Sequence, residues 1–110
     1  MTIRFRALES DESGPYVTST SLQGYIDISY AELVEMLGEP IGDDGYKVDA
    51  EWAILFGSGQ VATIYNYKDG RNYMGDEGLD KEDIRDWHIG GKSATAIKKV
   101  SELFPNHNIR

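Results

Sequence analysis

Residues 50–68 read AEWAILFGSGQVATIYNYK, and this stretch decides the fold. In its first part Trp52, Ile54 and Phe56 alternate with the residues between them, which is the pattern of a β-strand. Residues 57–59, Gly-Ser-Gly, suit a chain reversal, and residues 60–68 repeat the alternation as a return strand. Because apolar side chains stand on both faces of this hairpin, we expect it at the centre of an antiparallel sheet.

Two helices are predicted, one on each side of the hairpin in the sequence. Ser29 has Glu32 three residues later, the spacing of a capping box, and Gly38 suits the position after a helix end. Ser93 is expected to cap the second helix, which Pro105 ends. Apolar residues recur at helical spacing in both segments: Tyr30, Leu33, Val34 and Leu37 in the first, and Ala96, Ile97, Val100, Leu103 and Phe104 in the second.

The N-terminal third gives weaker signals. Residues 3–8 alternate apolar and polar side chains as in a short strand, and residues 9–15 are interpreted as a polar break. Residues 16–29 hold two β-prone pieces around a turn at Gln23-Gly24.

In the C-terminal half, residues 69–86 are predicted to be an acidic surface loop with one helical turn near 80–84. The last strand, residues 85–89, places Trp87 and His88 on opposite faces. Residues 106–110 are predicted to be a frayed tail. Residues 1–110 therefore form one α+β domain, an antiparallel sheet of four to five strands with two helices packed against it.

The composition excludes several classes of protein. The chain has no cysteine, which excludes disulfides, a thiolate nucleophile and cysteine-ligated zinc. It has no apolar run of the length that spans a bilayer and no signal-peptide stretch at its start. No spacing of His, Asp or Glu matches a metal site, so we expect no metal and no cofactor. A cytoplasmic location fits these features.

The net charge of −8 is unevenly placed along the chain. Eleven of the 19 acids but only three of the 11 bases precede residue 56. Such a field disfavours direct binding to nucleic acid or to anionic membranes and favours a basic protein surface. The residues expected to form one acidic face are Glu32, Glu35, Glu39, Asp43, Asp44, Asp49 and Glu51. The alternative is that the acids only keep a small protein in solution.

A second candidate site lies where the last strand meets the second helix. Gly90, Gly91, Lys92 and Ser93 would offer free backbone amides, the positive end of a helix dipole and an ammonium to a nucleotide or another anion. The alternative is that the two glycines only permit a tight turn. Tyr65, Tyr67 and His88 would lie beside this site, unless the tyrosines line the core.

The sequence offers little for catalysis. Of the two histidines, His107 falls in the predicted tail, so His88 is the only plausible general base of its type. No serine stands in a nucleophile-elbow motif. A non-enzymatic protein is therefore favoured. The uncharged aromatic strand 61–67 also makes a homodimer a hypothesis.

Three segments carry a resemblance to a known set of proteins. They are TSLQGYI at 20–26, VATIYNYK at 61–68 and WHIGG at 87–91, with Glu51, Trp52 and Ser93 between or beside them. In this combination the chain resembles small proteins encoded by bacteriophages and prophages, over residues 18–104. The resemblance implies a phage-encoded protein acting in the bacterial cytoplasm, and it carries over no catalytic residue. In that setting the leading hypothesis is an acidic interaction protein that binds a basic surface of a host or defence protein; the alternative is the anion-binding module at Gly90–Ser93.

Overall fold

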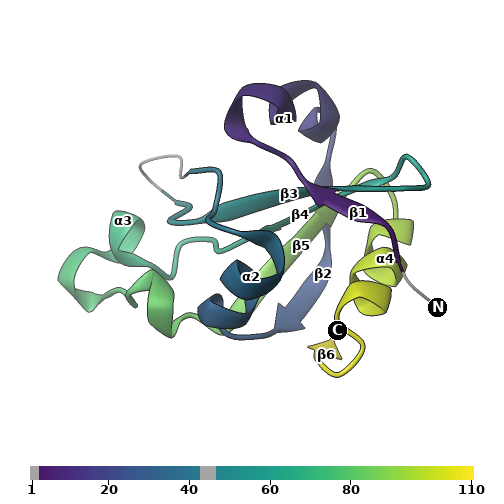
Figure 1. Ribbon diagram of the computed structural model, residues 1–110. Coiled ribbons are helices and arrows are strands. Elements are labelled where there is room, and N and C mark those ends of the chain that lie inside the picture. The colour runs from purple at the N-terminus through teal and green to yellow at the C-terminus, as the bar shows by residue number, and fades with distance from the viewer. Residues whose placement is uncertain (1–2, 43–46) are drawn as a thin grey trace.

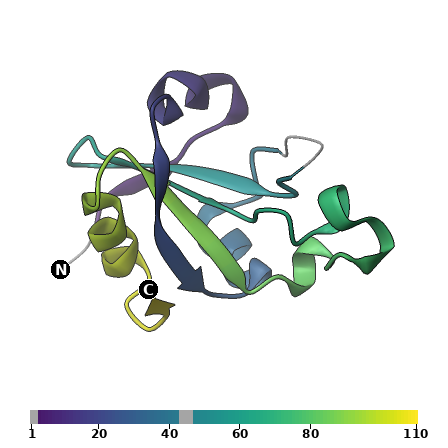
Figure 2. The ribbon, with the colours of Figure 1, turned by 180° about the vertical axis from the view of Figure 1, so that it is seen from behind.

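The computed structural model describes residues 3–42 and 47–110. In these ranges six strands form one antiparallel sheet with the order β1-β3-β4-β5-β2-β6. The strand direction turns from near horizontal in β3 to near vertical in β2, so the sheet is strongly twisted (Figures 1 and 2). The strands are β1 (Phe5–Ala7), β2 (Ser21–Asp27), β3 (Glu51–Phe56), β4 (Val61–Tyr65), β5 (Asp86–Gly91) and β6 (Asn108–Ile109).

The described residues also contain four α-helices and two 3₁₀ turns. These are α1 (Ser10–Val17), α2 (Tyr30–Leu37), α3 (Arg71–Met74), α4 (Thr95–Leu103), η1 (Gly75–Glu77) and η2 (Lys81–Asp83). The expected α+β fold is therefore confirmed, with more strands and helices than the sequence indicated.

The predicted hairpin is the β3–β4 pair, which lies inside the sheet with β1 on one side and β5 on the other. Trp52 lies opposite Ile64 and Ile54 opposite Ala62, so the core face follows the alternation in the sequence. At the turn the Gly59 amide donates to the Phe56 carbonyl at 2.8 Å. Gly59 has a φ of 91°, which favours glycine there.

Helices α2 and α4 contribute to the same core, on the face of the sheet that carries Trp52 and Trp87. The two indole rings meet edge to face with centroids 5.4 Å apart. Each indole N–H is satisfied, donating to the carbonyl of Gly38 at 2.8 Å or of Ile28 at 3.0 Å. In the view from behind, α2 lies beyond the sheet, and α1 stands over the upper part of the opposite face (Figure 2).

Both predicted helix starts are present, with one shift of boundary. The Ser29 hydroxyl accepts from the Glu32 amide at 3.1 Å, and Gly38 ends α2 with a φ of 84°. Helix α4 begins two residues after Ser93, whose hydroxyl accepts from the Thr95 amide at 3.3 Å while Ala94 occupies the cap position.

The predicted polar break at 9–15 is wrong, because helix α1 occupies most of it. The Glu9 amide donates to the Glu12 carboxylate at 3.1 Å, which satisfies one amide at the helix start. Gly14 and Pro15 both disfavour a helix. Pro15 lies in the last turn, however, where it costs only one backbone hydrogen bond.

The predicted turn at Gln23-Gly24 is also wrong, since β2 is one strand with a bulge there. Leu22 pairs with Gly90 and Gly24 with Ile89, which leaves Gln23 as the extra residue. A Cβ at Gly24 would lie 2.5 Å from the Ile97 side chain and 2.7 Å from the Arg110 carbonyl. The glycine therefore marks a close approach rather than a reversal.

The C-terminal tail is not frayed. Strand β6 pairs with β2, and the backbones of Arg110 and Tyr25 exchange two hydrogen bonds of 3.0 and 2.8 Å. His107 Nε2 lies 2.7 Å from a carboxylate oxygen of Glu32 on α2. The pairing partner is more than 80 residues away in the sequence, so no local pattern announced it.

The acidic segment 69–86 is mostly exposed and is folded into short turns. The Leu79 amide donates to the Asp69 carbonyl at 3.0 Å, and Arg71 pairs with Asp80 at 2.6 Å. The predicted helical turn near 80–84 is η2. Within the described ranges no helix has the length and apolar character needed to cross a bilayer.

Candidate functional site

Tyr25, Tyr65 and His88 lie side by side on the face of the sheet opposite the tryptophans. The register places His88 between Tyr65 on β4 and Tyr25 on β2. The His88 ring stacks on Tyr65 with centroids 5.3 Å apart and meets the edge of Tyr25 at 4.9 Å. Tyr67, beyond the end of β4, lies 5.9 Å from the same ring. Three of the predicted ligand residues are thus brought together.

A hollow of about 200 Å³ lies beside this cluster, and we call it the open-face groove. It is lined by Thr20, Ser21, Val48, Glu51, Thr63, Tyr65, Tyr67 and Gly90. Tyr67 is 40% exposed and Tyr65 is half-buried, so part of each side chain is accessible from solvent. The groove therefore offers stacking and hydrogen bonding to a small planar group.

The pKa values of two side chains in the cluster differ from the ordinary values. Burial lowers the pKa of the His88 imidazole, although the nearby Asp86 and Asp69 carboxylates act in the opposite direction. Burial also raises the pKa of the Tyr65 phenol, and the Glu51 carboxylate adds to that shift. Both groups are therefore neutral at pH 7, and His88 Nδ1 is buried without a hydrogen-bond partner.

The predicted anion site is not assembled in the expected way. Gly90 and Gly91 do not end the strand: they belong to β5 and pair with residues of both β2 and β4. A Cβ at Gly90 would lie 2.3 Å from the Thr63 hydroxyl, and one at Gly91 would lie 2.3 Å from the Ala96 Cβ. These glycines therefore allow close packing, and their amides lie within a paired strand.

Lys92 and Ser93 follow the strand and lie away from the aromatic cluster. Both are exposed, and they line a separate hollow of about 240 Å³ together with Pro15 and Tyr16 of α1. The structure thus divides the predicted set in two: Tyr65, Tyr67, His88 and Gly90 around the open-face groove, and Lys92 and Ser93 near α1.

The predicted acidic face is likewise divided. Glu32, Glu35 and Glu39 are exposed on or just after α2. Glu51 lines the open-face groove on the other side of the sheet. The Asp49 carboxylate accepts hydrogen bonds from the Asn66 side chain and the Asn72 amide, so it is part of the internal structure. Asp43 and Asp44 lie outside the described residues.

A notch between α1 and α2 joins acidic residues that the sequence reading did not connect. It has a volume of about 430 Å³ and carries Glu9 on one side and Glu39 on the other. The remaining lining residues are Ala7, Leu8, Ser10, Leu37, Pro40, Ile41 and Trp52. The capping spacing of Glu9 and Glu12 was the only local signal, and it reports the start of a helix rather than the notch.

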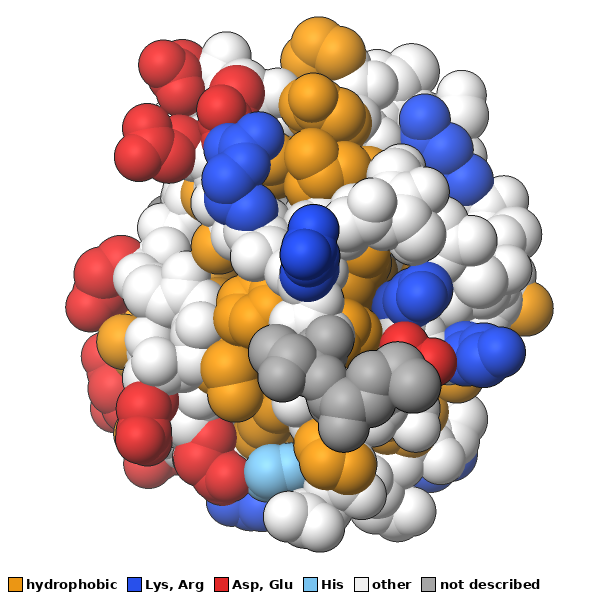
Figure 3. All heavy atoms as spheres, turned by 45° about the vertical axis from the view of Figure 1, so that its right-hand side comes forward, with side chains coloured by type: hydrophobic (Ala, Val, Ile, Leu, Met, Phe, Trp, Pro, Cys, Tyr) orange, Lys and Arg blue, Asp and Glu red, His pale blue; other side chains and the backbone are white. Residues whose placement is uncertain are grey.

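Acidic and basic side chains are unevenly placed on the face that Figure 3 shows. In Figure 3 most of the acidic side chains in view gather along the left edge, and the Lys and Arg side chains lie mainly toward the centre and right, with basic side chains also beside the upper acidic group and at the lower left. Neither helix contains a basic residue. Arg6 pairs with Glu12 beside α1, and both side chains of that pair are partly exposed.

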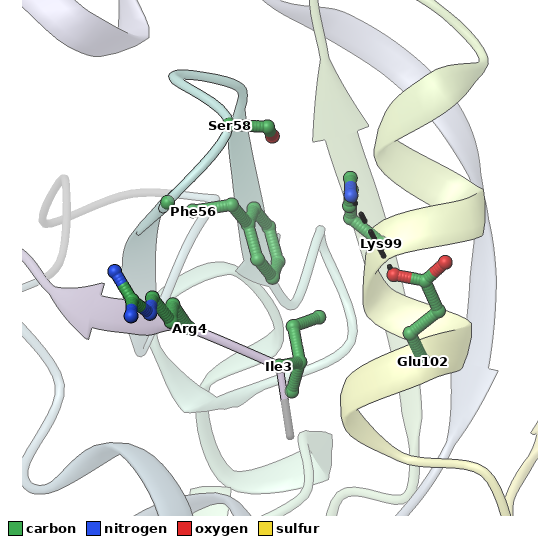
Figure 4. A pocket seen from close by; sticks show the side chains of 7 residues that line it. Ile3, Arg4, Phe56, Ser58, Lys99 and Glu102 are labelled. Carbon is green, nitrogen blue, oxygen red and sulfur yellow. Dashed lines mark ion pairs between the residues drawn. The ribbon is translucent and has the colours of Figure 1, made fainter. Parts of the chain in front are cut away.

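Another hollow, of about 420 Å³, lies between β1, the β3–β4 turn and α4 (Figure 4). Ile3 and Phe56 face it from the sheet side. On α4 the Lys99 ammonium pairs with Glu102 at 3.6 Å, so opposite charges meet within the wall. Arg4 lines the same hollow, so its wall carries one cation beyond the Lys99–Glu102 pair.

No metal centre is indicated: residues 3–42 and 47–110 contain no group of three or more potential ligands from His, Asp and Glu side chains. In comparisons with known proteins, no family model, curated protein or solved structure matches the chain.

Proposed function

We propose that this protein is a non-enzymatic interaction module that binds a basic surface of a host or defence protein. The observation that carries the proposal is the composition of two surface helices: Asp11, Glu32 and Glu35 are exposed on α1 and α2, and neither helix contains a lysine, arginine or histidine. A surface of one sign speeds encounter with a partner of the opposite sign and sets its orientation.

Both helices are held by a stiff support. Leu33 and Leu37 of α2 are buried in the core against the sheet, and Ser13 of α1 is buried as well. The carboxylates therefore keep their relative positions before the partner arrives, which lowers the entropy lost on binding. The same negative field disfavours nucleic acid and anionic membranes as direct partners.

The biological setting follows from the resemblance to phage and prophage proteins. We infer a protein made during infection that acts in the bacterial cytoplasm, where it occupies a basic surface of its target. Small acidic domains suit this task because they can take the place of a nucleic acid on such a surface.

The first test is capture from a bacterial lysate at low and at high salt. We expect a bound protein that is released as the ionic strength rises, because exposed charge pairs are screened over about 10 Å at 0.1 M salt. The variant Asp11→Asn/Glu35→Gln/Glu39→Gln is expected to lose the protein. The control Asp76→Asn/Glu77→Gln/Asp83→Asn changes the net charge equally on the loop and is expected to keep it. Absence of any salt-sensitive partner contradicts the proposal.

A second candidate function, binding of a small planar ligand, is favoured by the cluster of Tyr65, Tyr67 and His88. Thermal-shift measurements with nucleosides and nucleotides test it. Stabilisation by a nucleoside that is lost in Tyr65→Ala but kept in Lys92→Ala supports stacking in the open-face groove. Stabilisation that requires a phosphate and Lys92 supports the anion site instead.

A further inference from the structure

The notch between α1 and α2 brings two carboxylates from distant parts of the sequence to one hollow. Glu9 precedes α1 and Glu39 follows α2, and both are exposed. Most of the other lining residues are apolar, and Leu37 and Trp52 among them are almost fully buried. The hollow is therefore a concave place where a side chain could leave bulk water while its charge still meets an acid.

The charged side chains that line the notch are both acidic. The lining residues include no lysine, arginine or histidine. The nearest basic residue in the sequence, Arg6, pairs with Glu12. On the α2 side, burial raises the pKa of the Tyr30 phenol, and the Glu39 and Glu82 carboxylates add to that shift, while the Lys81 ammonium lies 5.8 Å from the centre of the same ring.

We infer that the notch seats one lysine or arginine side chain of the basic partner, with the charged end between Glu9 and Glu39. This rests on the proposed function, because it assumes that a basic protein is bound. Long basic side chains combine an apolar stem with a charged head, and the notch offers surroundings for both. A carboxylate also accepts hydrogen bonds from an ammonium or guanidinium, which shortens and strengthens the contact.

The notch differs from the other acidic positions on this side of the molecule. Asp11 and Glu35 stand exposed on the helices, where a charge pair gains little because water screens it. Binding energy in protein interfaces concentrates where an anchoring side chain enters a pocket, and arginine is enriched among such anchors. We therefore expect the side chain seated in the notch to contribute most of the binding energy. The exposed carboxylates on the helices should contribute only a general attraction to the basic partner.

The test uses the full chain and a defined probe. We titrate ¹⁵N-labelled protein with the Nα-acetyl methylamides of arginine and of lysine, whose side chains stay charged. The Nα-acetyl methylamide of citrulline has nearly the shape of the arginine probe and no charge, and it is the control. We expect shifts of the amides of residues 7–10, 37–39 and 41 and of the Trp52 indole with the charged probes only. Shifts spread over all acidic positions, or equal shifts with the citrulline analogue, overturn the inference.

Two variants of equal net charge then test which carboxylates bind the charged probe. Glu9→Gln/Glu39→Gln is expected to weaken probe binding by about fivefold, because it removes both charge partners and leaves the apolar walls of the notch in place. Asp11→Asn/Glu35→Gln has the same net charge and is expected to bind as the unmodified chain does. Equal weakening by both variants overturns the inference. Unchanged amide spectra away from the notch show that each variant is folded.

The lysate capture experiment distinguishes failure of the proposed function from failure of the notch as a binding site. A salt-sensitive partner that Glu9→Gln/Glu39→Gln still captures fully would leave the interaction module standing and remove the anchor. Failure to capture any partner with the unmodified chain would remove the proposed function itself.

Discussion

The fully buried side chain of Asn66 donates from Nδ2 to the Asp49 carboxylate at 2.9 Å. The same nitrogen donates to Asp69 at 3.0 Å, and Asn66 Oδ1 accepts from the amides of Asp49 and Ala50 at 2.7 and 3.1 Å. All four hydrogen-bonding positions of the amide are used. Asp49 is therefore part of the support that ties the segment before β3 to the acidic loop.

Asn66→Ala is expected to destabilise the fold by about 3 kcal/mol, because it leaves two amides and two carboxylates without their partner. Denaturant unfolding measures this cost. Asn66→Asp keeps the acceptor but places a third carboxylate beside Asp49 and Asp69. Its pKa should lie above the ordinary value, so the stability deficit is full near pH 7 and shrinks as the pH falls toward 4. A deficit that does not depend on pH would contradict this arrangement.

The network also shows why the acidic face could not be predicted from the charge pattern. Glu35, Asp49 and Glu51 all lie in the acidic half of the sequence. Strand alternation sends Glu51 to the face opposite α2, and the buried Asn66 takes up Asp49. The charge distribution in the sequence indicated the sign of the surface, and only the tertiary structure decided which carboxylates share a side.

The hairpin and the α2 cap were predictable because their signals are local. Alternation fixes the faces of β3 and β4, and Ser29 and Gly38 fix the ends of α2. The same alternation predicted that Tyr65 and Tyr67 share a face. Strand β6 and the notch depend on pairings between distant segments, which no local pattern reports.

The C-terminal tail is expected to contribute to stability. Removing residues 106–110 deletes the β2–β6 pairing and the contact of His107 with Glu32, and should cost about 1–3 kcal/mol in unfolding free energy. An equal midpoint for the shortened and the full chain would show that the tail is not docked.

The contact of His107 with Glu32 can be detected through the pKa of the Glu32 carboxyl. Hydrogen bonds from His107 and Ser29 hold the pKa of the Glu32 carboxyl below its ordinary value of 4.5. A lowered carboxyl pKa stabilises the fold above the ordinary value, and this contribution is lost as the pH falls through the lowered one. His107→Ala should therefore raise the Glu32 pKa toward 4.5, measured by carboxyl-carbon NMR. The control His88→Gln should leave it unchanged.

His88 is expected to titrate below the ordinary histidine range. Because burial lowers its pKa, the unfolded chain binds its proton first, and the unfolding free energy declines as the pH falls through the ordinary value of 6.5. The decline levels off once the pH is below the lowered value. His88→Gln should remove this part of the pH dependence between pH 7.5 and 5. An imidazole NMR titration at or above 6.5 would contradict the buried, stacked position.

Two glycine substitutions test the packing of α4 on the sheet. In Gly91→Ala the new Cβ would lie 2.3 Å from the Cβ of Ala96, and neither atom can rotate away, so α4 must shift. We expect a loss of about 2 kcal/mol in unfolding free energy. Gly14→Ala is the matched control, because nothing lies within 4 Å of its Cβ inside α1, and it should stabilise the chain by up to about 1 kcal/mol. If both variants unfold at the same denaturant concentration, helix α4 does not contact β5 at Gly91 as described.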